Sequence, residues 1–352
     1  MRLPALPPQP AGVPWPTDEW PRGDVPAGIA LDSLLDEVLD PDGELAATHA
    51  VLVVHHGSLV VERYAGAVEQ WDADPLPVHA DLPLLSWSMA KSMLHATVGI
   101  LVGEGRLDPS ARAPVPEWSD PDDPRHAITL DHLLAMRDGL DWVEDYVEAR
   151  GSDVIHMLFG KGQDDVGAFA AARDLAAPPG TRFNYSSGTS NIVARIVAGV
   201  VGAGARYERF LRERLFDPIG MRTATPTFDA AGTWIGSSYV HAIAQDFARF
   251  GLLYLRDGVW DGTRILPEGW VDHGRRPRSV DPDDGILHGA HWWAVGDEHG
   301  SFWASGYEGQ MVLVCPALDL LVVRLGKMPQ ERGPLLREWR NRVIAAFAAG
   351  AD

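Results

Sequence analysis

Two stretches with different hydrophobic periods follow each other in the first third of the chain. Residues 50–64 read AVLVVHHGSLVVERY, two apolar runs on either side of His56-Gly57-Ser58. A glycine-containing turn between such runs is typical of a β-hairpin. From Ser88 to Glu104 the apolar residues recur three or four positions apart, and Gly105 follows. This spacing predicts a largely buried helix that ends before Gly105.

The rest of the pattern divides the chain into a helical middle and a mixed C-terminal part. Between residues 109 and 233, apolar segments at helical spacing are joined by connections rich in Pro, Gly and Asp. Residues 244–256 and 334–349 predict two further helices. The strand-like runs are residues 291–295, 301–304, 310–315 and 320–325, the last two joined by a turn at 316–319.

Strands at both ends with helices between them predict an α+β fold. One antiparallel sheet is built from both termini and flanked by helices, with an all-helical domain inserted in the middle. The expected boundaries are a discontinuous sheet domain at 28–108 and 234–352 and a helical domain at 109–233. Residues 1–27 carry many prolines without periodicity, so we expect an extended arm laid over a surface. A cleft between the two domains is the expected site.

Charge and cysteine content narrow the range of partners and cofactors. The formal net charge is -19, which repels nucleic acid, so we expect no nucleic-acid partner. The single cysteine, Cys315, excludes an internal disulfide and a cysteine-built zinc site, and we expect no metal or other cofactor. The N-terminal residues lack the pattern of a secretory signal, and the apolar stretch 191–205 is interrupted by Arg195. These features predict a cytoplasmic protein that does not span a membrane.

The start of the predicted buried helix carries the first candidate for chemistry, Ser88-Met89-Ala90-Lys91. Residues three apart share a helix face, so we expect the Ser88 hydroxyl and the Lys91 amine to lie within hydrogen-bonding distance. Burial and the positive end of the helix dipole both disfavour an ammonium ion, and a neutral lysine can activate a serine. In the alternative, Ser88 caps the helix and Lys91 extends to solvent. His95, one turn further, is expected to be a packed histidine.

Two later motifs gain meaning beside the first. Residues 178–187 read PPGTRFNYSS, a turn and a short extended segment that present Tyr185 just before an apolar helix. The alternative is a tyrosine that only packs. Residues 303–310 read WASGYEGQ, where glycines within a strand pattern predict an edge strand or bulge that offers N–H groups to a carbonyl oxygen. The alternative is an ordinary turn.

In this order, the motifs resemble the serine β-lactamase and penicillin-binding-protein superfamily. The resemblance is closest to the class C β-lactamase-like branch that contains esterases and 6-aminohexanoate-dimer (nylon oligomer) hydrolases. It runs from about residue 50 to the C-terminal helix and includes AMRDGLDWVEDY around Tyr146 and the segment 244–262. It implies a β-lactamase/transpeptidase-like fold. By position, it implies Ser88 as nucleophile, Lys91 as base, Tyr185 as proton donor to the leaving group, and the N–H groups of Ser88 and Tyr307 as oxyanion donors.

The sequence departs from the β-lactamase pattern at two places. The third β-lactamase motif is Lys-Thr-Gly, whose cation holds a substrate carboxylate, and here Ala304-Ser305-Gly306 stands instead. Two residues after the tyrosine, β-lactamases carry an asparagine, and here Ser187 stands. Both departures weaken the case for a β-lactam substrate and leave acyl transfer intact. The substrate-binding residues that the resemblance implies are Tyr146, Ser187, Ser305 and Gly306.

The predicted function is a metal-free serine hydrolase that forms and hydrolyses an acyl-enzyme. Its substrate is a small ester or linear amide, as for a carboxylesterase or a 6-aminohexanoate-dimer hydrolase. One alternative is a β-lactamase or D-alanyl-D-alanine carboxypeptidase, against which the missing cation argues. Another is a non-catalytic binding module of the penicillin-recognising fold, against which the joint presence of Ser88, Lys91 and Tyr185 argues. The sequence leaves a homodimer open.

Overall fold

The runs at residues 50–64 form the hairpin β1 (Thr48–His55) and β2 (Ser58–Tyr64) in a computed structural model that describes residues 3–350. They belong to an eight-stranded sheet in the order β10-β11-β12-β13-β14-β15-β1-β2, and every pairing is antiparallel. β15 pairs with β1, so strands from the two ends of the chain lie side by side in one sheet, as predicted. The C-terminal strands are β10 (Ser279–Val280), β11 (Leu287–His288), β12 (Trp293–Ala294), β13 (Phe302–Gly306), β14 (Gln310–Cys315) and β15 (Leu320–Gly326).

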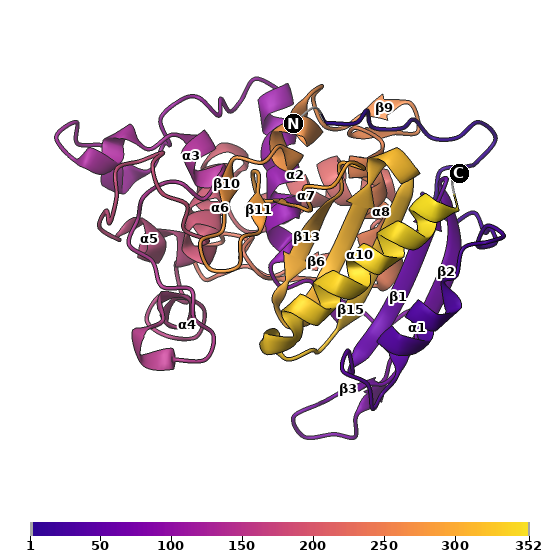
Figure 1. Ribbon diagram of the computed structural model, residues 1–352. Coiled ribbons are helices and arrows are strands. Elements are labelled where there is room, and N and C mark those ends of the chain that lie inside the picture. The colour runs from indigo at the N-terminus through magenta and orange to yellow at the C-terminus, as the bar shows by residue number, and fades with distance from the viewer. Residues whose placement is uncertain (1–2, 351–352) are drawn as a thin grey trace.

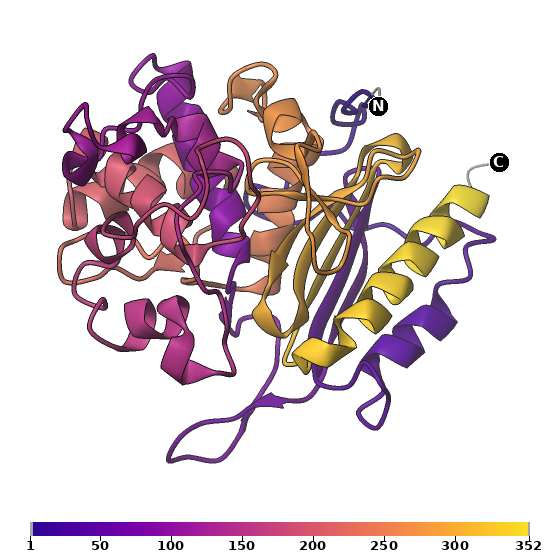
Figure 2. The same cartoon turned by 60° about the vertical axis from the view of Figure 1, so that its left-hand side comes forward.

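Helices cover both faces of this sheet because its strands are apolar on both faces. Ala50, Leu52 and Val54 of β1 point into one core, together with α2 (Met89–Gly103) and α8 (Ala244–Leu255). Val51 and Val53 point into a second core. That core is closed by α1 (Asp32–Leu39), which the sequence did not predict, and α10 (Gly333–Ala349) (Figure 2).

A helical region lies beside the sheet (Figure 1). Its apolar residues join the same core as α2 and α8, so one hydrophobic interior runs through both parts. The division at residues 108 and 234 therefore stays a prediction. The helices of this region are α3 (Leu130–Leu134), α4 (Asp153–Phe159), α5 (Val166–Ala171), α6 (Ser187–Val201) and α7 (Ala205–Leu211). The other elements are α9 (Trp270–Arg275), β3 (Ala67–Val68), β4 (Leu76–Pro77), β5 (Leu84–Leu85), β6 (Thr225–Pro226), β7 (Val240–Ala242), β8 (Val259–Trp260) and β9 (Thr263–Arg264).

Residues 3–27 of the proline-rich N-terminal segment form no helix or strand, and buried arginines hold this segment in place. Arg249 Nε donates to the Pro16 carbonyl at 2.7 Å, and Arg275 Nη2 donates to the Pro4 carbonyl at 2.6 Å. Arg256 Nε donates to Gln9 Oε1 at 2.9 Å. The first two bonds satisfy backbone carbonyls that no secondary structure uses, and all three tie the segment to the rest of the protein.

Within residues 303–310, Trp303–Gly306 belong to β13, which is not an edge strand. β13 lies between β12 and β14. However, β12 has two residues and pairs only with Phe302 and Trp303, so it does not extend along Ala304–Gly306. The backbone there keeps a local edge inside the sheet, and this edge faces the site described below.

Among residues 3–350, no single helix is both long and apolar enough to cross a membrane. The pair formed by Ser187–Val201 and Ala205–Ile219 passes by length and composition together, but it is bent by 98°. Most of α6 is buried inside the protein.

Candidate active site

Ser88 and Lys91 meet at the first turn of α2. Ser88 occupies the N-cap position but makes no side-chain cap hydrogen bond, so it is not a capping serine. Lys91 Nζ donates to Ser88 Oγ at 2.8 Å, and the lysine is only 2% exposed. The alternative of a lysine extending to solvent is therefore wrong. The spacing of three residues on one helix brings the two groups together, as expected.

The hydrogen-bond acceptors of the Lys91 ammonium are all uncharged. Besides Ser88, Nζ donates to Ser187 Oγ at 3.0 Å and to the Ser237 carbonyl at 2.9 Å. Among the described residues, no carboxylate lies within ion-pair distance of Lys91. Burial lowers the pKa of Lys91 to about 8, and the more distant Glu144 carboxylate opposes this shift. A fraction of Lys91 is therefore neutral near pH 7 and able to accept a proton.

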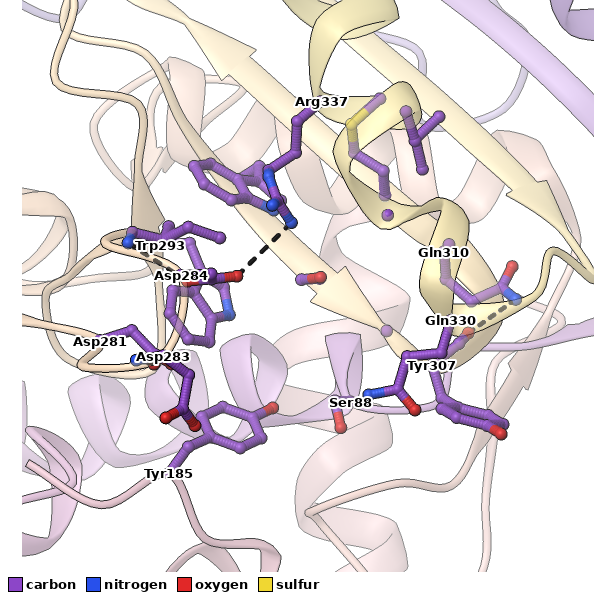
Figure 3. A pocket seen from close by; sticks show the side chains of 18 of the residues that line it. Ser88, Tyr185, Asp281, Asp283, Asp284, Trp293, Tyr307, Gln310, Gln330 and Arg337 are labelled. Carbon is purple, nitrogen blue, oxygen red and sulfur yellow. Dashed lines mark hydrogen bonds and ion pairs between the residues drawn. The ribbon is translucent and has the colours of Figure 1, made fainter. Parts of the chain in front are cut away.

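Tyr185 faces the same serine. It lies two residues before α6, whose N-cap Ser186 accepts from the Thr189 N–H at 2.9 Å and so fixes the entry of the chain into the helix. Lys91 Nζ lies 4.8 Å from the centroid of the Tyr185 ring. Burial raises the pKa of the phenol, and the neighbouring Ser88 hydroxyl partly offsets this. Figure 3 shows the Tyr185 hydroxyl directed toward Ser88.

A cavity of about 710 Å³ opens over these groups and is lined by Ser88 and Tyr185. Tyr307 lines the opposite side (Figure 3). Trp293 and Trp303 add an aromatic wall, and charged side chains such as Asp283 and Arg337 also line the cavity. Lys91 lies behind this surface, where it is shielded from solvent. Of the predicted substrate-binding residues, the cavity is lined by Tyr146, Ser305 and Gly306.

The fourth predicted substrate-binding residue, Ser187, is placed differently. It is fully buried and does not line the cavity. Its hydroxyl lies between Lys91 Nζ, at 3.0 Å, and Glu144 Oε1, at 2.5 Å. This placement favours a role in holding Lys91 over direct contact with a substrate.

Glu144 is the residue that the sequence analysis missed. Its Oε2 accepts from the Ser187 N–H at 2.9 Å and from Trp142 Nε1 at 2.6 Å, and its Oε1 accepts from the Tyr146 hydroxyl at 3.1 Å. These bonds tie the loop that carries Tyr146 to the start of α6. In the sequence, Glu144 stands inside GLDWVEDY, two residues before Tyr146, where the local pattern does not distinguish it from Asp141 and Asp145.

Backbone segments that carry the two predicted oxyanion donors lie against each other. A Cβ atom added to Gly306 would lie 2.5 Å from the carbonyl oxygen of Ser86. Only glycine permits this approach between the end of β13 and the segment that enters α2. Ser88 and Tyr307 consequently border the same cavity.

Other titratable groups near α2 have structural partners. His95 is fully buried, with Nδ1 2.8 Å from the Tyr254 hydroxyl and Nε2 3.1 Å from His273 Nδ1. It is a packed histidine, as expected. Within residues 3–350, no group of three or more His, Cys, Asp or Glu side chains is arranged to hold a metal ion.

A family model described as Beta-lactamase matches residues 35–347. The chain belongs to the beta-lactamase family. It is 28% identical over 337 residues to a 6-aminohexanoate-dimer hydrolase from Paenarthrobacter ureafaciens, covering 89% of this chain and 81% of the relative. With the geometry above, family membership identifies the chain as a beta-lactamase-family serine hydrolase.

Solved structures share the fold of this family member. One is a Bacillus anthracis protein provisionally named a 6-aminohexanoate-dimer hydrolase, with a TM-score of 0.76, 22% identity, and coverage of 98% of this chain and 90% of that chain. Another is a family VIII carboxylesterase, with a TM-score of 0.70, 17% identity, and coverage of 92% and 99%. The predicted β-lactamase/transpeptidase-like architecture is therefore confirmed.

Proposed function

We propose that this beta-lactamase-family protein hydrolyses a small ester or linear amide through an acyl-enzyme on Ser88. The observation that carries the proposal is the buried Lys91 amine, 2.8 Å from Ser88 Oγ and without a carboxylate partner among the described residues. A lysine whose pKa lies near 8 combines a useful neutral fraction with enough basicity to take a proton.

In the first half of the reaction, Ser88 Oγ attacks the carbonyl carbon and its proton passes to neutral Lys91. The carbonyl oxygen becomes an oxyanion that accepts from the N–H groups of Ser88 and Tyr307. The tetrahedral intermediate then collapses, and the alcohol or amine leaves with a proton that Tyr185 donates. Lys91, whose Nζ lies 4.8 Å from the centroid of the Tyr185 ring, then returns the proton that it took from Ser88 to Tyr185.

Water completes the cycle. It attacks the acyl carbon and gives its proton to the Lys91 and Tyr185 pair, and Ser88 Oγ leaves with a proton. Because burial raises the pKa of Tyr185, the phenol is protonated at neutral pH and suited to donate. The product is a carboxylic acid, and the pair ends in its starting protonation state.

The lining of the cavity supports an ester or linear amide over a β-lactam. Ala304-Ser305-Gly306 supplies no cation where β-lactamases use lysine to hold the substrate carboxylate. Trp293 and Trp303 instead present apolar surface. The relatives named 6-aminohexanoate-dimer hydrolase and carboxylesterase have activities of this class.

The test is turnover of p-nitrophenyl esters, aminohexanoate dimer and nitrocefin by the wild type and Ser88→Ala. We expect ester turnover in the wild type and its loss in the variant, because no other group replaces the attacking oxygen. Ser110→Ala, which changes an exposed serine, is the matched control. Turnover that survives in Ser88→Ala would assign the chemistry to another residue, and turnover of nitrocefin alone would favour a β-lactamase.

A further inference from the structure

Both predicted oxyanion donors stand next to a residue with an unusual backbone conformation. Trp87, immediately before Ser88, has φ +45°. Glu308, immediately after Tyr307, has φ +62°. Residues with a Cβ atom seldom adopt the left-handed region, and outside turns such conformations gather at functional sites. Trp87 forms the peptide bond that contains the Ser88 N–H and so helps to direct that donor, and Glu308 shapes the turn that holds Tyr307 in place.

The side chains of these two residues contact each other. Trp87 Nε1 donates to Glu308 Oε2 at 3.3 Å. The Trp87 ring also packs edge-on against the Tyr307 ring, with 5.5 Å between centroids and 78° between planes. These side chains thus connect the turn before Ser88 with the turn after Tyr307, and the backbones of the same two segments approach each other closely at Gly306.

Each turn is also fixed from behind. Ser86 Oγ donates to the Trp87 carbonyl at 3.0 Å and accepts from the Val240 N–H at 3.1 Å. The Glu308 carbonyl accepts from the fully buried Arg324 Nη1 at 3.0 Å and from the Met328 N–H at 3.0 Å. Because α2 and the sheet hold the two turns separately, the Trp87–Glu308 bond is the side-chain hydrogen bond that joins them.

We propose that Trp87 and Glu308 form a positioning pair that fixes the spacing of the Ser88 and Tyr307 N–H groups. The inference rests on the proposed function. Trp87 holds the Glu308 carboxylate at the indole N–H, which keeps this negative charge from turning toward the developing oxyanion. Neither residue touches the reacting atoms, so both act through the two backbone donors.

The test separates the side-chain bond from the backbone conformation. Trp87→Phe keeps a ring against Tyr307 and removes the donor. Glu308→Gly removes the acceptor and suits a positive φ, so its melting temperature should match or exceed that of the wild type. Since loss of one oxyanion donor costs about 100-fold or more in kcat, displacing a donor should lower kcat about tenfold in either variant, with KM within about twofold.

Two further variants complete the design. Glu308→Gln retains an acceptor and should recover most of the kcat lost in Glu308→Gly. The double variant Trp87→Phe/Glu308→Gly should be no slower than either single variant, because both remove the same bond. Near-ultraviolet circular dichroism and thermal melting confirm that each variant is folded.

The outcomes distinguish the pair from the proposed function. Ser88-dependent ester turnover that is unchanged in Trp87→Phe and Glu308→Gly would overturn the positioning pair alone. Effects that multiply in the double variant would also overturn it, because they would show two independent roles. Absence of Ser88-dependent turnover in the wild type would overturn the proposed function, and the pair with it.

Discussion

Two buried cations of this protein, Lys91 in the site and Arg256 beneath the N-terminal segment, are stabilised in opposite ways. Lys91 donates to two serine hydroxyls and one carbonyl. Arg256 is equally buried but pairs with the Asp319 carboxylate at 2.5 Å. A buried ammonium with neutral acceptors loses its proton readily, whereas a guanidinium beside a carboxylate keeps its charge. The surroundings of the two cations therefore suit Lys91 for proton transfer and Arg256 for a structural ion pair.

Residue type reinforces this difference. Lysine can shed its proton when burial lowers its pKa, and arginine effectively cannot. The three arginines that hold the N-terminal segment never need to change charge. The chain contains only three lysines, and the one on α2 is buried beside a serine. The comparison predicts that replacing Lys91 with arginine abolishes proton transfer from Ser88, because arginine keeps its proton.

Lys91→Arg should have the largest effect. The charge stays, but the guanidinium cannot accept the Ser88 proton, so kcat should fall about 1,000-fold, within the range that general bases contribute. Ester turnover measured from pH 6 to pH 10 checks this. Lys161→Arg, on an exposed lysine, is the matched control and should leave turnover near the wild-type value. If Lys91→Arg remained within tenfold of the wild type, Lys91 would not be the base.

Asp319→Asn tests the structural side of the comparison. Asparagine keeps the size of the side chain and tolerates the φ of +45° at this position, but it leaves Arg256 charged without a carboxylate. The free energy of unfolding should fall by about 3 kcal/mol, as when one partner of a buried ion pair is removed. Urea unfolding measures this loss.

An exposed ion pair provides the control for that loss. Asp217 is 52% exposed beside Arg212, so Asp217→Asn should change the free energy of unfolding by about 0.5 kcal/mol or less. If Asp319→Asn also changed the free energy of unfolding by about 0.5 kcal/mol or less, the ion pair between Arg256 and Asp319 would not stabilise the protein. Ester turnover per folded molecule should persist in both variants, because neither residue lines the cavity.

The sequence predicted the sheet, the buried helix and the contact between Ser88 and Lys91, because each depends on local spacing. Short, largely apolar runs became β1, β14 and β15, and a spacing of three on one helix fixed the serine and lysine. Tyr185 could be named only by resemblance, since its approach to Ser88 joins segments about a hundred residues apart along the chain.

What the sequence could not predict depends on contacts between distant segments. Glu144 reaches Ser187 from a loop, and nothing in the local pattern marks a carboxylate that folds back onto a helix start. The two-residue β12 leaves a local edge inside the sheet, which a period-2 pattern cannot reveal. The short helix α1 is a different case, because its buried residues Leu34, Leu35 and Val38 stand at helical spacing and the local pattern could have predicted it.

Asp138, a buried carboxyl that does not line the cavity, shows that burial can shift a pKa where no reaction takes place. Asp138 accepts from the Leu140 N–H at 2.8 Å and from the Thr189 hydroxyl at 2.7 Å, and burial raises its pKa to about 6. Its folded pKa exceeds the unfolded value, so its ionisation costs stability above pH 6 and this cost disappears as the pH falls. Like Lys91, it has neutral partners, but it lies outside the cavity.

Between pH 7.5 and pH 5.0, Asp138 should therefore add about 1.4 kcal/mol to the free energy of unfolding, one pKa unit of proton binding. Asp138→Asn keeps both hydrogen bonds by presenting its oxygen to Leu140 and its amide to Thr189, and it should lack this increment. Asp120→Asn is the control, since Asp120 is exposed and also accepts from a backbone N–H two residues on. An equal pH dependence in wild type and Asp138→Asn would place the titration elsewhere.

Glu144→Gln should give the smallest effect and tests whether a remote carboxylate tunes Lys91. The Glu144 charge opposes the lowering of the Lys91 pKa, so its removal should lower that pKa further. Only neutral Lys91 accepts the Ser88 proton, so kcat/KM in the wild type should rise with pH and level off above about pH 8. In Glu144→Gln the rise should occur at lower pH. Asp281→Asn is the control, because the Asp281 carboxylate helps to raise the pKa of Tyr185 but is not one of the charges that shift the pKa of Lys91. A rise at the same pH in the wild type and Glu144→Gln would mean that the Glu144 charge does not tune Lys91.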